Sequence, residues 1–416
     1  MNEGCIPTKT LLRSAEVMHL VRDRAYEFGV RGIDPTNIWF DLESAVARKD
    51  KIVQDIVDGI YGWIEPNANI TFLRGQAEFT SPVDIRVDGQ QITAVNSVIA
   101  TGSRTADVQI PGLAEIGYLT NRDALMLQKL PASLIVIGGG YIGIEFAQMY
   151  ARFGTDVTIL SRSPRLMRHE EPELSGRLAQ VLTAEGIEVQ LGATAVSAAK
   201  EGSQKVVIAR MGEQAHRFAA EEVLYAAGRV PRVEGLGLEQ AGVEVGPQGI
   251  LYDETLRTTA DNIWSLGDVN GGAMFTHRAT YDGPIVALNA VKGAGRTIDY
   301  RVVPRAVFTQ PALASVGLTE AEALAAGYEV KVGTALFAHS GRAKAIGETE
   351  GILKFIADAA TGELLGGHIL GPHADILIHQ VVTAMYNKGT AESLYKSIHI
   401  HPTLSEMVKD AAKKLR

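Results

Sequence analysis

Residues 134–146 read LIVIGGGYIGIEF, in which an apolar run meets a cluster of glycines. An uninterrupted apolar run is typical of a strand buried on both faces, and residues 157–160 predict a second strand that closes a βαβ unit. Between them, Gly138-x-Gly140-x-x-Gly143 is the dinucleotide-binding fingerprint. Its first glycine makes the tight turn, its second lets the backbone approach a pyrophosphate, and its third lets the helix pack against the strand. The N–H groups that open this helix favour phosphate, so we expect a dinucleotide to bind here.

The end of the second strand bears on which dinucleotide binds. An NAD site usually has Asp or Glu there, which accepts a hydrogen bond from the ribose 2′-hydroxyl. This chain has Ser161 and Arg162 instead, with Arg165 and Arg168 close behind. Guanidinium groups grip phosphate bidentately, so we expect NADPH in preference to NADH. The alternative is that these arginines form a solvated, salt-bridged surface.

Composition excludes several classes of protein. The 416 residues carry a net charge of −8 and are 46% hydrophobic and 21% charged, which is ordinary globular usage and rules out disorder for the bulk of the chain. A pI near 5.8 with no block of Lys or Arg predicts no nucleic-acid partner, and the apolar run at 134–144 is too short to cross a bilayer, so we expect no membrane partner. The one cysteine, Cys5, excludes an intrachain disulfide and a thiolate-built zinc site. It suits a reducing compartment, so we expect a cytoplasmic protein with no metal site.

Hydrophobic periodicity indicates an α/β protein of two or three domains. Residues 8–22 predict a helix that begins just after Cys5. Short strands are expected at 70–73, 84–87, 97–99 and 187–191, and a further helix at 173–184. The last part of the chain differs, with antiparallel strands expected at 330–336, 351–356 and 364–370 and helices at 375–387 and 404–415. This pattern predicts a separate α+β module.

Five motifs in order along the chain resemble those of the class I pyridine nucleotide–disulfide oxidoreductases. They are GCIPTK at 4–9, ATG at 100–102, the glycine motif with Glu145 at 138–145, GD at 267–268 and HPTLSE at 401–406. The resemblance implies two Rossmann-like dinucleotide-binding domains, for FAD and NAD(P), and a C-terminal α+β dimerisation domain. The implied boundaries are 1–116 and 235–300 for the two parts of the FAD domain, 117–234 for the NAD(P) domain and 301–416 for the dimerisation domain.

The start of the chain departs from the family pattern. The family opens with a βαβ unit that holds the FAD pyrophosphate, and its redox segment is a cysteine, four residues and a second cysteine. Counting back from Cys5 puts the first cysteine immediately before Met1. We therefore expect the first FAD βαβ unit to be missing and the reading frame to extend upstream; a natural one-cysteine variant is the alternative.

The resemblance also implies roles for individual residues. Cys5 would be the flavin-facing thiol, Lys9 and Glu145 an ion pair beside flavin and nicotinamide, and Tyr141 a gating aromatic side chain over the nicotinamide. His401 and Glu406 would be the acid–base pair that reaches the partner's disulfide across a homodimer, with the glutamate orienting the imidazole. The implied FAD contacts are Ala100, Thr101, Gly102, Gly228, Gly267, Asp268, Met274 and His277. The bland alternatives are a buried inert thiol for Cys5 and an Asx-turn residue for Asp268.

These roles imply that hydride passes from NADPH to FAD, then to a cysteine pair, and then to a disulfide or related small-molecule oxidant. Mercuric reductase and dihydrolipoamide dehydrogenase are the alternatives within the class, and residues 4–11 also resemble the bacterial reductases tied to reactive-chlorine and copper stress. A small disulfide, a quinone and a metal ion stay open as substrates. Outside the class, the alternative is a non-catalytic dimeric protein that binds NADPH.

Overall fold

The computed structural model describes residues 2–415 and divides the chain into two units. Of these residues, the first unit comprises 2–53, 108–227 and 301–415, and the second comprises 54–107 and 228–300. The four-part division expected from the sequence stays a prediction.

A four-stranded parallel sheet with the order β12-β6-β7-β8 carries the glycine motif in the first unit. The run 134–137 is at most 6% exposed, as a strand covered on both faces requires. The elements of this region are β6 (Ser133–Ile137), α5 (Tyr141–Phe153), β7 (Asp156–Ser161), α6 (Pro172–Ala184), β8 (Glu188–Leu191), β12 (Glu222–Tyr225), α3 (Leu113–Ile116) and α4 (Asn121–Ala124). The predicted βαβ unit is therefore present.

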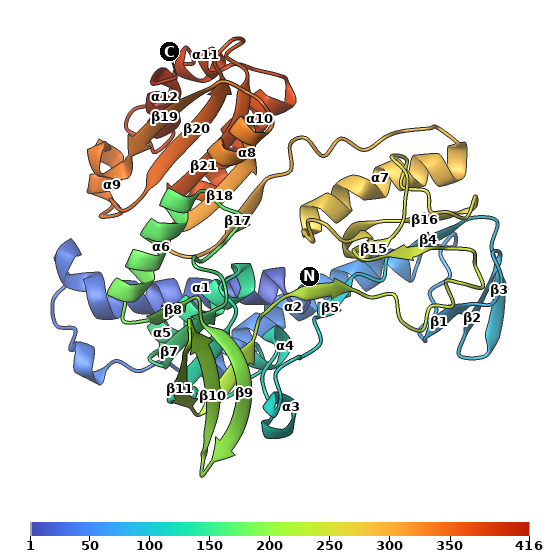
Figure 1. Ribbon diagram of the computed structural model, residues 1–416, viewed down its shortest axis with the longest axis horizontal. Helices are drawn as coiled ribbons and strands as arrows, with labels where there is room; N and C mark the ends of the chain where they lie inside the picture. The colour runs from blue at the N-terminus through green and yellow to red at the C-terminus, as the bar shows by residue number, and fades with distance from the viewer. Residues whose placement is uncertain (1, 416) are drawn as a thin grey trace. The chain divides into compact units, whose positions relative to one another are not determined.

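A three-stranded antiparallel sheet follows β8, which the sequence did not predict. Its strands are β9 (Thr194–Glu201), β10 (Gln204–Met211) and β11 (Gln214–Ala220), drawn in light green in Figure 1. Val206, Val207 and Ala209 of β10 are buried, whereas much of β11 is exposed. The weak apolar signal of β11 explains why the sequence pattern gave no sign of this sheet.

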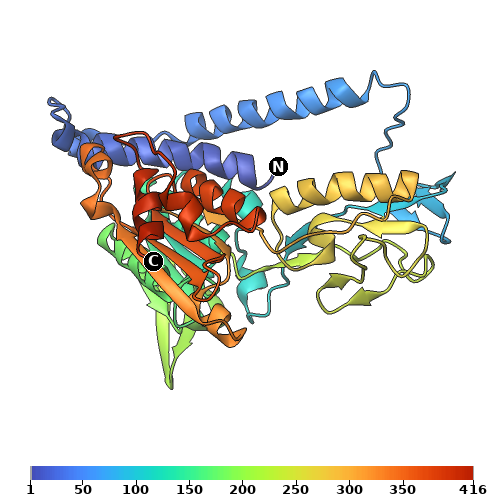
Figure 2. The same cartoon turned by 90° about the horizontal axis from the view of Figure 1, so that it is seen from above.

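The C-terminal part of the first unit is a five-stranded antiparallel sheet with the order β17-β18-β21-β20-β19. Its strands are β17 (Arg305–Val307), β18 (Ala312–Gly317), β19 (Val330–Leu336), β20 (Ile352–Asp358) and β21 (Leu364–Gly371). The accompanying helices are α8 (Glu320–Ala325), η5 (Phe337–His339), α9 (Gly341–Ala345), α10 (Ala374–Tyr386), α11 (Ala391–Tyr395) and α12 (Glu406–Lys413). Helices α10 and α12 pack on this sheet, as the red and orange ribbons of Figure 2 show. The predicted α+β module is present.

The parallel sheet and the C-terminal sheet share part of one core. Leu134 and Val136 of β6 belong to the same buried cluster as Val307, Leu313 and Leu370 of the C-terminal sheet. Helix α1 (Cys5–His19) also contributes Leu11 and Ala15 to this cluster. It continues as a π-helical turn and short 3-10 turns: η1 (Leu20–Arg24), η2 (Ala25–Phe28) and η3 (Pro35–Asn37). The long helix α2 (Leu42–Ile64) then runs from the first unit into the second.

The second unit is built from short strands and one long helix. They are β1 (Ala77–Phe79), β2 (Asp84–Val87), β3 (Gln90–Thr93), β4 (Ser97–Ile99), β5 (Ser103–Thr105), β13 (Arg229–Pro231), β14 (Val245–Gly246), β15 (Gly249–Ile250), β16 (Ile263–Ser265), η4 (Gly267–Asn270) and α7 (Thr276–Lys292). The strand expected at 70–73 is wrong, because this segment is not a strand. Phe72 and Leu73 are exposed, so these apolar residues do not mark a buried strand. Among the described residues, no helix is both long and apolar enough to span a membrane.

Candidate active site

The glycine-rich turn joins β6 to α5, with Gly140 at the N-cap of the helix. Gly138 has φ +129°, and a Cβ there would lie 2.3 Å from the carbonyl oxygen of Ala226. A Cβ on Gly143 would lie 2.0 Å from the carbonyl oxygen of Gly138, so helix and strand pack too closely for any side chain. A Cβ on Gly140, by contrast, would meet nothing within 4 Å. Gly140 therefore leaves open the space that a pyrophosphate would need at this helix end.

The loop after β7 presents its arginines outward and its apolar residues inward. Ser161 is buried at the strand end, Arg162 and Arg168 are exposed, and Arg165 donates through Nη2 to the carbonyl oxygen of Arg168 at 2.7 Å. Within residues 2–415, none of these three arginines forms an ion pair with a carboxylate. The salt-bridged surface considered above therefore finds no partners in this loop.

An ion pair joins α1 to α5. Lys9 Nζ lies 2.8 Å from each carboxylate oxygen of Glu145, which is 4% exposed. The Phe308 N–H also donates to Glu145 Oε1 at 2.9 Å, and Lys9 Nζ lies 4.4 Å from the centre of the Phe308 ring. The pair implied by the resemblance is thus present, and three contacts fix its charges in place.

Cys5 is the first residue of α1, and its side chain is exposed. The buried cysteine considered from the sequence is therefore excluded.

Two predicted FAD motifs meet in the second unit. The parallel strands β4 and β16 pair side by side, so residues 100–102 and 267–268 follow the same edge of the pair. Asp268 Oδ2 accepts a hydrogen bond from Ser103 Oγ at 2.6 Å, and Thr101 Oγ1 donates to the carbonyl oxygen of Arg232 at 2.7 Å. Ligands of open parallel sheets bind beyond this carboxyl edge, so the Asp268 carboxylate stands where a flavin nucleotide would be held.

The remaining predicted FAD contacts lie in the same unit. Gly228 precedes β13, and its carbonyl oxygen accepts from the Ala106 N–H at 3.1 Å. Met274 and His277 flank the start of α7, where the His277 ring stacks on Phe275 with 5.3 Å between ring centres. Their flavin roles stay predictions.

His401 and Glu406 form a histidine–carboxylate pair at the start of α12. His401 Nδ1 lies 3.0 Å from Glu406 Oε1, and the Thr403 N–H donates to Glu406 Oε2 at 3.0 Å. The Thr403 amide and then the His401 ring hold the pKa of Glu406 below its ordinary value. The His401 side chain is 80% exposed, so the arrangement orients an exposed imidazole and leaves its Nε2 unoccupied by Glu406.

Comparisons with known proteins agree with this geometry. Residues 1–283 match the family profile described as pyridine nucleotide-disulphide oxidoreductase, and residues 303–412 match the dimerisation domain of the same family. The chain belongs to this family. The predicted class of activity, FAD-dependent and NAD(P)H-driven oxidoreduction at disulfides, is confirmed at the level of the family. The dimerisation domain supports a homodimer.

Family members of more than one activity are similar to this chain. A dihydrolipoyl dehydrogenase from Chlorobaculum parvum is 40% identical over 99% of this chain and 88% of its own length. A mercuric reductase from Bacillus cereus is 36% identical over 98% of this chain, which spans 64% of that protein. The structure of the HOCl-induced flavoprotein disulfide reductase RclA from Escherichia coli has a TM-score of 0.88 and 32% identity, and the match covers 100% of this chain and 91% of that one.

One expectation about the family pattern needs correction. The predicted absence of the first FAD βαβ unit is not supported, because the matches extend over 98 to 100% of this chain. The expectation rested on the family's opening strand, GxGxxG and helix, which this sequence does not show before Cys5, and on the half motif at Cys5.

The sequence analysis did not identify Glu170 and Arg305, which form a cluster with the predicted site residue Tyr141. Tyr141 OH donates to Glu170 Oε1 at 2.7 Å, and Arg305 Nε donates to the same oxygen at 2.6 Å. Glu170 is 1% exposed. The available signal was two adjacent carboxylates, Glu170 and Glu171, three residues beyond the apolar pair Leu166 and Met167.

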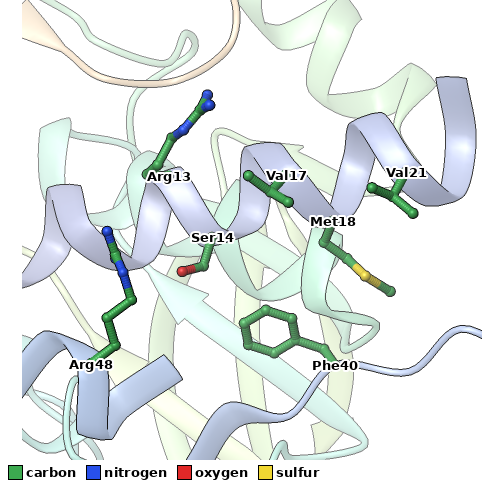
Figure 3. A pocket seen from close by; sticks show the side chains of 7 residues that line it. All are labelled: Arg13, Ser14, Val17, Met18, Val21, Phe40 and Arg48. Carbon is green, nitrogen blue, oxygen red and sulfur yellow. The ribbon is translucent and has the colours of Figure 1, made fainter. Parts of the chain in front are cut away.

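A groove of about 470 Å³ runs beside α1 and contains none of the predicted site residues (Figure 3). Figure 3 shows Val17, Val21 and Phe40 on its apolar side and two arginines at one end. Its lining residues are Arg13, Ser14, Val17, Met18, Val21, Phe40 and Arg48. The groove therefore lies outside the chemistry proposed below.

Proposed function

We propose that this family member is an NADPH-preferring flavoenzyme that reduces a small disulfide. The observation that carries the nucleotide preference is the arginine loop: Ser161 replaces the carboxylate that an NAD site uses, and Arg162 and Arg168 lie exposed without carboxylate partners. Three guanidinium groups within one short loop suit a 2′-phosphate.

The two dinucleotides, NADPH and FAD, would bind at two separate sites, each at the carboxyl ends of parallel strands. Gly138, Gly140 and Gly143 would hold the NADPH pyrophosphate, with Lys9 and Glu145 beside the nicotinamide. Residues 100–102 and 267–268 would hold FAD, with Asp268 accepting a hydrogen bond from its ribityl chain. When bound, the flavin supplies two-electron transfer between the nicotinamide and sulfur.

The substrate side would use Cys5 and the histidine–carboxylate pair. The Cys5 sulfur would attack the substrate disulfide and form a mixed disulfide, while one substrate thiolate leaves and gains a proton. Two electrons from the reduced flavin would then cleave the mixed disulfide and release the second thiol. Glu406 orients His401 so that Nε2 can hold or release the proton that thiol–disulfide exchange requires. His401 would serve Cys5 of a second copy, since the nearby Ile398 and Ile400 are 100% and 78% exposed and would be covered by a partner.

A disulfide is the substrate that the site supports best. Some relatives carry names that refer to a metal, namely mercuric reductase and the Cu(II) complex of RclA. The acid–base pair is a feature that disulfide chemistry needs, because each thiolate that leaves must gain a proton.

Comparing Arg162→Ala with Arg177→Ala tests the nucleotide preference. Arg177 is a half-exposed arginine of α6 that pairs with Glu173, so its variant loses a surface ion pair. A hydrogen bond to a charged group contributes about 1.5–3 kcal/mol, so Arg162→Ala should lower kcat/KM for NADPH by roughly 10- to 150-fold and leave that for NADH unchanged. Arg177→Ala should change neither. Equal kcat/KM values for the two nucleotides in the unmodified enzyme would refute the preference.

A further inference from the structure

A buried carboxylate ties the glycine-rich turn to the C-terminal sheet. Glu170 lies in the loop between β7 and α6, and its Oε1 accepts from Tyr141 of α5 and from Arg305 of β17. The Glu170 side chain is 1% exposed and that of Arg305 is 18% exposed. Three elements that are distant in sequence thus meet at one oxygen atom.

The backbone of the loop holds this carboxylate rigidly. The Met167 N–H donates to the carbonyl oxygen of Gly139 at 2.8 Å, and the Glu170 N–H donates to the carbonyl oxygen of Met167 at 2.8 Å. Leu166 and Met167 are buried beneath these bonds. Glu170 is therefore fixed relative to the glycine-rich turn from which Tyr141 projects.

The charges of the cluster strengthen the hydrogen bond to Tyr141. Burial alone would raise the pKa of Glu170, but the Arg305 guanidinium, together with hydrogen bonds from Ser315 and Tyr141, holds that pKa below its ordinary value. Burial, and then the Glu170 carboxylate, raises the pKa of the Tyr141 hydroxyl. Tyr141 therefore stays a proton donor to an ionised acceptor at neutral pH, which is the stronger class of hydrogen bond.

We propose that Glu170, anchored by Arg305, is a positioning residue that fixes the Tyr141 ring at the nicotinamide end of the dinucleotide site. The proposal rests on the proposed function, in which the nicotinamide lies beside residues 140–145. Tyr141 directly follows the N-cap of α5, so it lies next to the helix end that would bind the dinucleotide. Because the ring is already fixed, no conformational entropy of the Tyr141 side chain is lost when the nicotinamide approaches the flavin.

Tyr141→Phe tests this role with one atom removed, and Tyr150→Phe is its matched control. Both tyrosines lie on α5, and Tyr150 OH likewise donates one buried hydrogen bond, to the carbonyl oxygen of Ala124 at 2.6 Å. In the flavin-loaded full chain, stopped-flow absorbance should show that Tyr141→Phe slows flavin reduction at saturating NADPH by about tenfold, the effect of roughly one hydrogen bond. Tyr150→Phe should lower the thermal midpoint and keep the wild-type reduction rate.

A second pair of variants tests the anchor. Arg305→Met should slow flavin reduction as Tyr141→Phe does, and Arg305→Lys, which keeps a cation beside Glu170, should restore most of the rate. Binding of 2′,5′-ADP, measured by calorimetry, should change less than twofold in every variant, because this probe carries the 2′-phosphate without a nicotinamide. Wild-type reduction rates in Tyr141→Phe, or equal losses in Tyr150→Phe, would overturn the positioning role.

The same measurements separate this role from the nucleotide preference. If 2′,5′-ADP binds the unmodified enzyme no better than 5′-ADP does, the NADPH preference fails. The effect of Tyr141→Phe is then measured with NADH, and a tenfold loss would still support the positioning role, whereas an unchanged rate would overturn it as well.

Discussion

At the scale of single residues, His401 is the side chain whose loss should divide the reaction into two halves. Its Nδ1 is held by Glu406 and its ring is exposed, so it can serve a partner outside its own pair. General acid–base catalysis contributes ~10²–10⁴-fold. We expect His401→Gln to slow turnover with a disulfide by about that factor.

Flavin reduction by NADPH, followed by stopped-flow absorbance, should stay near normal in His401→Gln. Glu406→Gln should show a milder loss of the same kind, since the Thr403 N–H can still hold the amide oxygen. Full disulfide turnover in His401→Gln would contradict the assignment and would favour a metal ion or quinone as substrate.

Pairs of residues that lie within one short motif could be predicted from the sequence. Pairs that are distant in the sequence and meet only in the folded protein could not. His401 and Glu406 are five residues apart, so one short motif contains both members of the pair. Arg305 lies 135 residues from Glu170, and an arginine at the start of a short strand has no pattern that names its partner. Lys9 and Glu145 are as distant, and they were paired through the family resemblance alone.

At the scale of elements, two glycines of the strand–turn–helix unit have different roles. Gly143 is needed for the helix to pack on the strand, and Gly140 leaves room for the dinucleotide. A methyl group on Gly143 would collide with the backbone oxygen of Gly138, whereas one on Gly140 would enter open space. We expect Gly143→Ala to destabilise the first unit, which a lowered thermal midpoint would reveal. Gly140→Ala should keep the wild-type midpoint and weaken NADPH binding, as measured by calorimetry.

Either glycine variant could contradict this reading of the turn. Unchanged NADPH affinity in Gly140→Ala would show that the dinucleotide does not approach this helix end. A wild-type midpoint in Gly143→Ala would show that α5 can shift away from β6 without loss.

Elements were predictable where apolar residues form a buried run and were missed or wrong where the burial is partial. The strand β6 and the C-terminal strands β19 to β21 have buried, patterned residues and were expected close to their observed bounds. The antiparallel sheet β9–β11 escaped because β11 is largely exposed, and residues 70–73 misled because their apolar side chains face solvent.

At the scale of the whole molecule, the Glu170–Arg305 pair makes the folding stability of the first unit depend on pH in the acid range. The folded-state pKa of Glu170 is lower than its ordinary value of 4.5, so the unfolded chain binds more protons between these two values. The stabilisation is therefore complete above about pH 4.5 and is lost as the pH falls through the folded-state pKa.

Glu170→Gln measures this contribution. Removing one partner of a buried pair leaves the other charge uncompensated, which costs about 3 kcal/mol near neutral pH. We expect the thermal midpoint of Glu170→Gln to lie well below that of the unmodified protein at pH 7, with the difference shrinking as the pH falls below 4.5. A difference that stays constant with pH would show that the carboxylate charge is not what stabilises this contact.

The loop between β7 and α6 also sets a limit on protein engineering. Residues 162–168 carry the arginines that face outward, but Glu170 and Glu171 immediately beyond them bind Arg305 and Lys354 of the C-terminal sheet. A transplanted loop meant to exchange one nicotinamide cofactor for the other must therefore stop at His169. If it runs two residues further, it replaces the carboxylates that fasten the dimerisation domain, and a change intended for the choice of electron donor would weaken the assembly instead.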